Sequence, residues 1–157
     1  MNKLRPLLGN NVINQIAFVV HDIETASEAF AKLLGMPKPE WFLTGSLEIS
    51  QVVYRGEPSA ARSKLIFMDT PSIQIELIEP NEDPSTMREF LDIDGEGIHH
   101  VAFDVDDMKD RVSRWKIKDS RSYRQVSSLP AMADTRMLIR WTNTRHLSSC
   151  WSGKSRR

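Results

Sequence analysis

A short internal repeat constrains the fold of this chain more than any other feature of its sequence. When residue 98 is aligned with residue 13, an offset of 85, five of the eleven positions from there onward are identical. The identical pairs are Ile13 and Ile98, Ala17 and Ala102, Phe18 and Phe103, Val20 and Val105, and Asp22 and Asp107. Average composition gives roughly one-half of an identity by chance in such a window, although two buried strands followed by capped helices could converge on similar residues. A repeat of this period indicates a supersecondary unit that is present twice.

The first copy of the unit is predicted to contain a strand, a helix and three further strands. Residues 13–20 are mostly apolar and rich in branched side chains, which is typical of a buried strand. Asp22 is a suitable N-cap for a helix that ends at Gly35. Further strands are expected at residues 47–54, 63–68 and 72–78, loops at 36–46 and 80–84, and a short helix at 85–91. A strand at residues 98–105 then opens the second copy.

Three polar residues on these strands are candidate metal ligands. Gln15 and His100 occupy the same position in the two copies, and Glu76 lies in the last strand of the first copy. Each has a simpler interpretation when taken alone, because a single His is usually structural and a single Glu in a strand usually faces solvent. Their matched placement favours one shared cleft that suits a divalent ion such as Zn, Ni, Co, Mn or Mg. We interpret His21 and His99 as surface residues or as residues behind the ligands.

The residues of both copies resemble the vicinal oxygen chelate superfamily of glyoxalase I-like metalloenzymes. The resemblance covers residues 11–112, and its most specific parts are NQIAF at 14–18, IELIEP at 75–80 and GIHHVAF at 97–103. It implies an α+β fold of paired βαβββ modules in a single domain over residues 1–157. The first module spans residues 11–80, and residues 97–112 begin the second. Proteins of this fold commonly form homodimers, so we also expect a homodimer.

The resemblance implies both a ligand set and a reaction. Gln15, Glu76 and His100 match three metal-ligand positions of the family. The expected activity is that of a metal-dependent glyoxalase-like lyase or isomerase, in which a proton is transferred next to a carbonyl through a metal-bound enediolate. Glu76 is the candidate for the group that moves the proton. Arg62 is a candidate to bind an anionic group of the substrate, with a surface salt bridge as the alternative.

Two branches of the family are represented in the motifs. Gln at position 15 resembles glyoxalase I, whereas GIHHVAF at 97–103 resembles methylmalonyl-CoA epimerase. The epimerase pattern has His at the first ligand position and Glu-Gln-Gly before the third strand, where this chain has Gln15 and Ala-Ala-Arg at 60–62. An epimerase acting on an acyl-CoA therefore stays an alternative, as does a metal-free protein of the same fold that sequesters drugs.

The composition changes abruptly near Ser113. Residues 1–112 contain 19 acidic and 10 basic side chains, whereas residues 113–157 contain 2 acidic and 11 basic ones. Codons for residues 115–123, 132–142 and 146–152 permit, in one shifted frame, sequences that resemble the missing helix end and last strands of the second module. We infer a frameshift near Ser113, with a divergent, disordered basic tail as the alternative.

This frameshift hypothesis leads to further predictions about residues 113–157. The segment should be poorly packed, because it shows no pattern typical of a strand or a helix. The strand at residues 98–105 should then expose an unpaired edge. The shifted frame places a glutamate codon across Trp151 and Ser152, so the protein as written should lack a fourth, carboxylate ligand. We therefore expect weak metal binding and little isomerase activity.

Several other classes of protein do not fit the composition. The chain has one cysteine, Cys150, which excludes a disulfide framework and a four-Cys zinc site. No apolar run approaches the roughly 20 residues of a membrane span, and no apolar signal-peptide region follows the first residues. The basic residues after Ser113 are scattered and match no nucleic-acid-binding motif. We expect a cytoplasmic protein whose partner is a small oxo or acyl-thioester substrate, rather than nucleic acid or a membrane.

Overall fold

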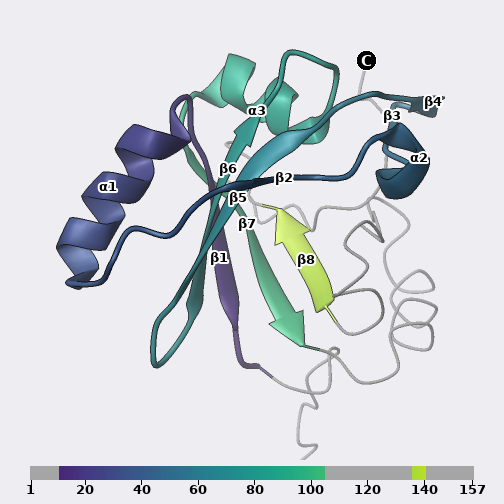
Figure 1. Cartoon of the computed structure of the whole chain (residues 1–157). Coiled ribbons are helices and arrows are strands. Elements are labelled where there is room, and N and C mark those ends of the chain that lie inside the picture. The colour runs from purple at the N-terminus through teal and green to yellow at the C-terminus, as the bar shows by residue number, and fades with distance from the viewer. Residues whose placement is uncertain (1–10, 105–135, 141–157) are drawn as a thin grey trace, which may run out of the picture.

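A computed structural model describes residues 11–104 and 136–140 of the chain (Figure 1). Its helices are α1 (Ile23–Leu34), α2 (Leu47–Ser50) and α3 (Thr86–Asp94). Its strands are β1 (Gln15–Val19), β2 (Phe42–Leu43), β3 (Val53–Tyr54), β4 (Glu57–Pro58), β5 (Ser63–Asp69), β6 (Gln74–Pro80), β7 (Gly97–Asp104) and β8 (Arg136–Arg140). This mixture of one large sheet with few helices confirms the predicted α+β fold class.

Six strands form the main sheet, in the order β2-β5-β6-β1-β7-β8, and β3 pairs with β4 in a separate hairpin. The first βαβββ module is complete and consists of β1, α1, β2, β5 and β6. Within it β1 and β6 are parallel, whereas β5 is antiparallel to both β2 and β6. β7 begins the second copy and pairs antiparallel with β1. The two first strands of the repeat therefore lie side by side at the centre of the sheet (Figure 1).

The prediction of an unpaired edge on the second module was wrong. β8 pairs antiparallel with β7 over five residues, so the edge of β7 beyond β1 is covered. The sequence of β8 has only three consecutive apolar residues between two arginines, which is too short a run to show a strand pattern. The other residues of 113–157 lie outside the described residues, and so do the predictions made for them.

β8 also departs from the symmetry of the repeat. In the first module, the strand next to β1 is β6, and the two are parallel. In the second half of the sheet, the strand next to β7 is β8, and the two are antiparallel. At the position beside β7 where the repeat predicts a parallel strand, the described residues thus place a strand of the opposite direction.

The expected strand at residues 47–54 was also wrong in its detail. Residues 47–50 form the short helix α2, and only Val53 and Tyr54 are extended. Gln51 has a φ of 47°, which interrupts any continuous extended backbone at this point. The second strand of the module is instead β2, at two residues within the expected 36–46 loop.

The ends of α1 agree with the predicted caps. The Asp22 side chain accepts hydrogen bonds from the backbone N–H groups of Glu24 and Thr25, at 2.9 and 3.1 Å. The backbone and side-chain hydrogen bonds from Thr25 lower the pKa of the Asp22 carboxyl. At the other end, Gly35 adopts a left-handed conformation with a φ of 65°, which glycine tolerates without strain.

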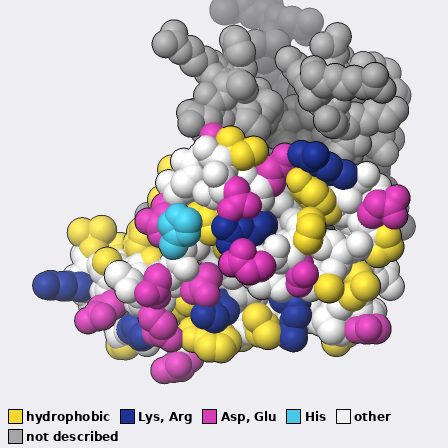
Figure 2. All heavy atoms as spheres, turned by 90° about the horizontal axis from the view of Figure 1, so that it is seen from above, with side chains coloured by type: hydrophobic (Ala, Val, Ile, Leu, Met, Phe, Trp, Pro, Cys, Tyr) yellow, Lys and Arg dark blue, Asp and Glu magenta, His cyan; other side chains and the backbone are white. Residues whose placement is uncertain are grey.

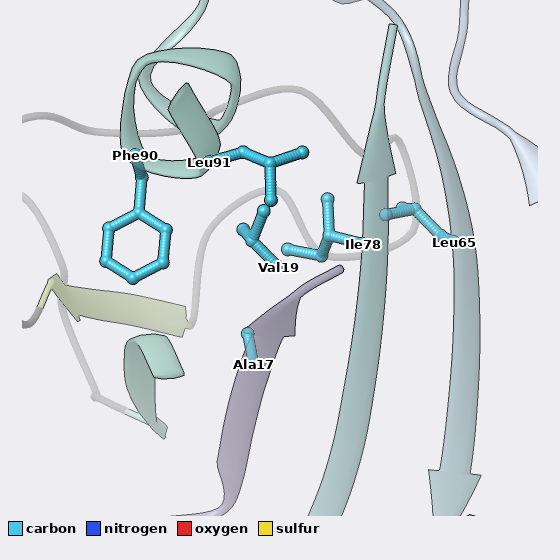
Figure 3. Packing of buried hydrophobic residues seen from close by; sticks show 6 residues of the cluster. All are labelled: Ala17, Val19, Leu65, Ile78, Phe90 and Leu91. Carbon is cyan, nitrogen blue, oxygen red and sulfur yellow. The ribbon is translucent and has the colours of Figure 1, made fainter. Parts of the chain in front are cut away.

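The two longer helices cover opposite faces of the sheet. α1 packs on the face that we call the outer face, in a core cluster of Val20, Ile23, Ala31, Ile66, Met68 and Leu77. α3 packs on the inner face, where Phe90 and Leu91 contact a cluster that includes Ala17, Val19 and Ile78 (Figure 3). Because α3 lies over Val19 and Ile78, it covers only one end of the inner face. The candidate site lies next to this cluster, toward the start of β1.

The exposed surface around α3 carries mixed charges. Arg88 pairs with Asp92 and with Glu82, and Arg55 pairs with Glu89. Acidic, basic and hydrophobic side chains are interspersed over the face seen in Figure 2. Such exposed pairs contribute little to stability, so α3 is held mainly by the inner-face apolar cluster.

Candidate active site

The site is built on the three central strands of the sheet. Ala17 of β1 is the cross-strand partner of Glu76 in β6 and also of His100 in β7. Direct cross-strand partners project from the same face, so Glu76 and His100 flank Ala17 on the inner face. Their strands are two spacings apart, about 10 Å. The small side chain of Ala17 leaves room for the two long ones to converge above it, and His100 Nε2 lies 3.4 Å from Glu76 Oε2.

Gln15 completes the polar group from the same strand as Ala17. It lies two residues before Ala17, so both side chains project from the same face. Its side-chain Nε2 donates a hydrogen bond to Gln74 Oε1 at 2.8 Å, and Gln74 Nε2 donates in turn to Asp69 Oδ1 at 2.8 Å. With the amide nitrogen held in this way, the Gln15 carbonyl oxygen is the atom left for a ligand.

His99 lies inside the fold, which corrects the option of a surface position. The register between β1 and β7 shifts at this residue, because Ala17 pairs with His100 whereas Phe18 pairs with Ile98. This bulge turns His99 into the interior, where it is 3% exposed and packs edge-on against the ring of Phe90. Its Nδ1 lies 2.9 Å from His100 Nδ1. His21, in contrast, is exposed.

Burial separates the three predicted ligands from bulk water. Gln15, Glu76 and His100 are 2%, 6% and 3% exposed. Among the described residues, His100 Nε2 has no hydrogen-bond partner, and it lies beyond the usual hydrogen-bond length from the Glu76 carboxylate. Two ligand atoms at about 2.0–2.2 Å from one tetrahedral zinc ion are themselves about 3.4 Å apart. The separation of these two atoms and their N/O chemistry therefore fit a divalent cation.

The donor set relies on an amide as its third member. The residues that the structure describes contain no group of three His, Cys, Asp or Glu side chains suited to a metal ion. Glu76 and His100 supply two donors of these types, and the Gln15 carbonyl oxygen is the third. Amide oxygen is a weaker ligand than carboxylate, because it carries no negative charge.

The repeat identifies the position where a fourth ligand would be expected. Glu76 is the cross-strand partner of Ala17, and the equivalent of Ala17 in the second copy is Ala102. The partner of Ala102 in β8 is Leu138. Because β8 runs opposite to β6, it does not reproduce β6 in the repeat, and the residue that it pairs with Ala102 is not a carboxylate.

Arg62 does not lie near these residues. It precedes β5, five residues before Phe67, which is the cross-strand partner of Glu76. Five residues of extended strand span about 16 Å. The Arg62 Nε donates a hydrogen bond to the backbone carbonyl oxygen of Thr44 at 2.8 Å. The structure thus brings Gln15, Glu76 and His100 to one face but leaves Arg62 at the other end of its strand.

The fold defines an α+β protein built on a βαβββ unit. Its central strands carry three buried residues with N or O donor atoms on the inner face, namely Gln15, Glu76 and His100. The family model of the Glyoxalase/Bleomycin resistance protein/Dioxygenase superfamily matches residues 14–126. The chain belongs to this superfamily, the vicinal oxygen chelate family that its motifs resemble. The match extends beyond residue 112, where the resemblance was expected to end.

Solved structures with a similar fold include two methylmalonyl-CoA epimerases. The enzyme from Mycobacterium tuberculosis is 21% identical, with a TM-score of 0.53 over 86% of this chain and 80% of its own. A hypothetical protein from Bacillus halodurans is 20% identical, with a TM-score of 0.55 over 82% and 83%. A variant of the Streptomyces coelicolor epimerase in complex with 2-nitronate-propionyl-CoA is 18% identical, with a TM-score of 0.51 over 82% and 96%. At these identities, the similarity establishes the fold alone.

No curated protein sequence matches the chain. None of the helices in the described part of the chain is long and apolar enough to cross a membrane.

Proposed function

We propose that the chain is a metal-dependent lyase or isomerase that transfers a proton at a carbon next to a carbonyl group. The observation that carries this proposal is the close approach of His100 Nε2 and Glu76 Oε2, 3.4 Å apart in a buried position. Gln15 lies on the same face and has its amide nitrogen already engaged. Gln15, Glu76 and His100 would hold the ion, and when bound it would polarise the substrate carbonyl as a Lewis acid.

Glu76 is the residue that we assign to proton transfer. Its carboxylate lies on the inner face between Ala17 and Phe67, which are its cross-strand partners. These neighbours donate no hydrogen bonds to it, and burial limits its contact with water. A carboxylate in such surroundings can take a proton from the carbon and return it to the same carbon or to its neighbour.

An acyl-CoA epimerase is the second candidate. The GIHHVAF motif at 97–103 supports it, as does the similarity of fold to methylmalonyl-CoA epimerases. Epimerisation requires a second group that protonates the opposite face of the carbon. Of the described carboxylates, Glu76 alone approaches a ring nitrogen of His100, which favours the glyoxalase-like lyase or isomerase as the first candidate. If no ion binds, the remaining alternative is a metal-free protein of the same fold that sequesters a small molecule.

The test combines metal binding with a substrate screen. Purified protein would be titrated by calorimetry with Zn, Ni, Co, Mn and Mg salts, and its metal content measured by elemental analysis. Each loaded form would then be assayed with methylglyoxal–thiol adducts and with acyl-CoA epimers. We expect one ion per chain at low affinity, and turnover of one substrate class. Stoichiometric binding of a small molecule without any metal would contradict the proposal and favour sequestration.

The same assays apply to a protein in which the shifted frame after Ser113 is restored. If residues 113–157 lack a carboxylate ligand, the restored protein should bind metal more tightly and turn over faster. Tight binding of one ion and rapid turnover by the protein as written would contradict the frameshift hypothesis. Size-exclusion chromatography with light scattering would test the proposed homodimer on the same samples.

Gln74 offers a test of how Gln15 is oriented. Replacing Gln74 by methionine keeps the length of the side chain but removes the acceptor for the Gln15 amide nitrogen. Groups that orient metal ligands typically contribute 10–100-fold to affinity, so we expect metal binding about tenfold weaker. The exposed Gln51 provides the matched control, and Gln51→Met should bind metal like the original protein. Unchanged binding by Gln74→Met would show that the hydrogen bond from Gln15 to Gln74 does not orient a ligand.

A further inference from the structure

The two adjacent histidines of β7, His99 and His100, contact each other through their Nδ1 atoms. The bulge in β7 places both side chains in the interior, although neighbouring residues of a regular strand project from opposite faces. His99 and His100 are each 3% exposed, and their Nδ1 atoms lie 2.9 Å apart. The rings are close to perpendicular, with an interplanar angle of 83°. At this distance one Nδ1 must donate a proton and the other must accept it.

The direction of this hydrogen bond determines what His100 Nε2 can do. A neutral imidazole carries one proton, on either Nδ1 or Nε2. If His99 donates, His100 accepts at Nδ1 and carries its proton on Nε2, which then cannot bind a metal ion. If His100 donates from Nδ1, its Nε2 carries the lone pair and faces the Glu76 carboxylate. Only the second arrangement gives the ligand that the proposed function requires.

We propose that His99 is a positioning residue that accepts a hydrogen bond from His100 Nδ1–H and so keeps His100 in its metal-binding tautomer. This inference rests on the proposed function. The packing of His99 against Phe90, with ring centroids 5.3 Å apart and planes at 87°, restricts rotation of the His99 ring. His99 Nδ1 is therefore held where the acceptor is needed, and the ligand is oriented before the ion arrives.

A matched pair of variants separates the acceptor from the packing. Asparagine at position 99 keeps an acceptor oxygen close to the position of Nδ1, whereas leucine has the same shape as asparagine and no acceptor. We expect His99→Asn to bind Zn²⁺ within about threefold of the original protein, and His99→Leu to bind it about 10–100-fold more weakly. The exposed His21 supplies a further control, because His21→Leu should leave metal affinity unchanged. Thermal unfolding of each variant would identify any general loss of structure.

The tautomer can be measured directly by long-range ¹H–¹⁵N NMR on metal-free protein at fixed pH. We expect the proton of His100 on Nδ1 in the original protein and in His99→Asn, and a mixture of tautomers in His99→Leu. A proton on His100 Nε2 in the original protein would overturn the proposal, and so would equal Zn²⁺ affinities of His99→Asn and His99→Leu. If the original protein binds no metal, the proposed function fails, but the tautomer measurement still decides the role of His99.

Discussion

Replacing Glu76 by glutamine is expected to lower turnover by about 10²–10⁴-fold, the range typical of a lost general base. Glutamine has nearly the same shape as glutamate, so the packing around Ala17 and Phe67 should be retained. The change removes the negative charge that the proposed ion needs and the basicity that proton transfer needs. Metal affinity should therefore fall together with turnover, and calorimetry with Zn²⁺ and a steady-state assay would measure the two effects.

Glu79 provides the matched control for this change. It lies on the same strand as Glu76 but three residues on, which places it on the outer face. There it accepts hydrogen bonds from Lys64 Nζ and from the backbone N–H of Ile23. Glu79→Gln should lower stability slightly and leave metal affinity unchanged. If Glu76→Gln keeps full activity, or if the two variants lose metal equally, Glu76 is neither ligand nor base.

The part of the site that could be predicted from the sequence depends on strand periodicity. Gln15 and Glu76 lie in regular strands, where alternate residues share a face, so the pattern of apolar neighbours was sufficient to orient them. The repeat then related His100 to Gln15. The parallel pairing of β1 with β6, which brings Glu76 beside Ala17, is a long-range interaction that has no local signal in the sequence.

The features that were missed are those in which local geometry departs from regular periodicity. A single-residue bulge in β7 brings His99 and His100 into contact, and no residue in GIHHVAF at 97–103 identifies such a bulge in advance. The left-handed backbone at Gln51 ends α2 and divides residues 47–54 between a helix and a strand. β8 has little periodicity of its own, and its pairing with β7 is a long-range interaction. Each case depends on tertiary contacts that override local preference.

Ile66 should give the largest loss of stability among single truncations in β5. It is 0% exposed and belongs to the outer-face cluster that packs beneath α1. Replacing it by alanine leaves a cavity between Leu77 and α1, because the surrounding strands are fixed by their hydrogen bonds. Burial of this kind predicts a decrease in the free energy of unfolding of about 2–5 kcal/mol, which chemical denaturation monitored by circular dichroism would measure.

Ile93 allows the same deletion of atoms to be made in an exposed position. It lies in α3 and is 74% exposed, and alanine has the higher helix propensity, so Ile93→Ala should change stability by no more than about 0.5 kcal/mol. The two variants are compared by their decrease in the free energy of unfolding. The difference between these decreases measures the effect of burial, apart from a contribution of up to about 1 kcal/mol from strand propensity at position 66. Equal losses at the two positions would contradict the outer-face core. Since Ile66 and the site lie on opposite faces of the sheet, Ile66→Ala should still bind Zn²⁺ normally at temperatures where it remains folded.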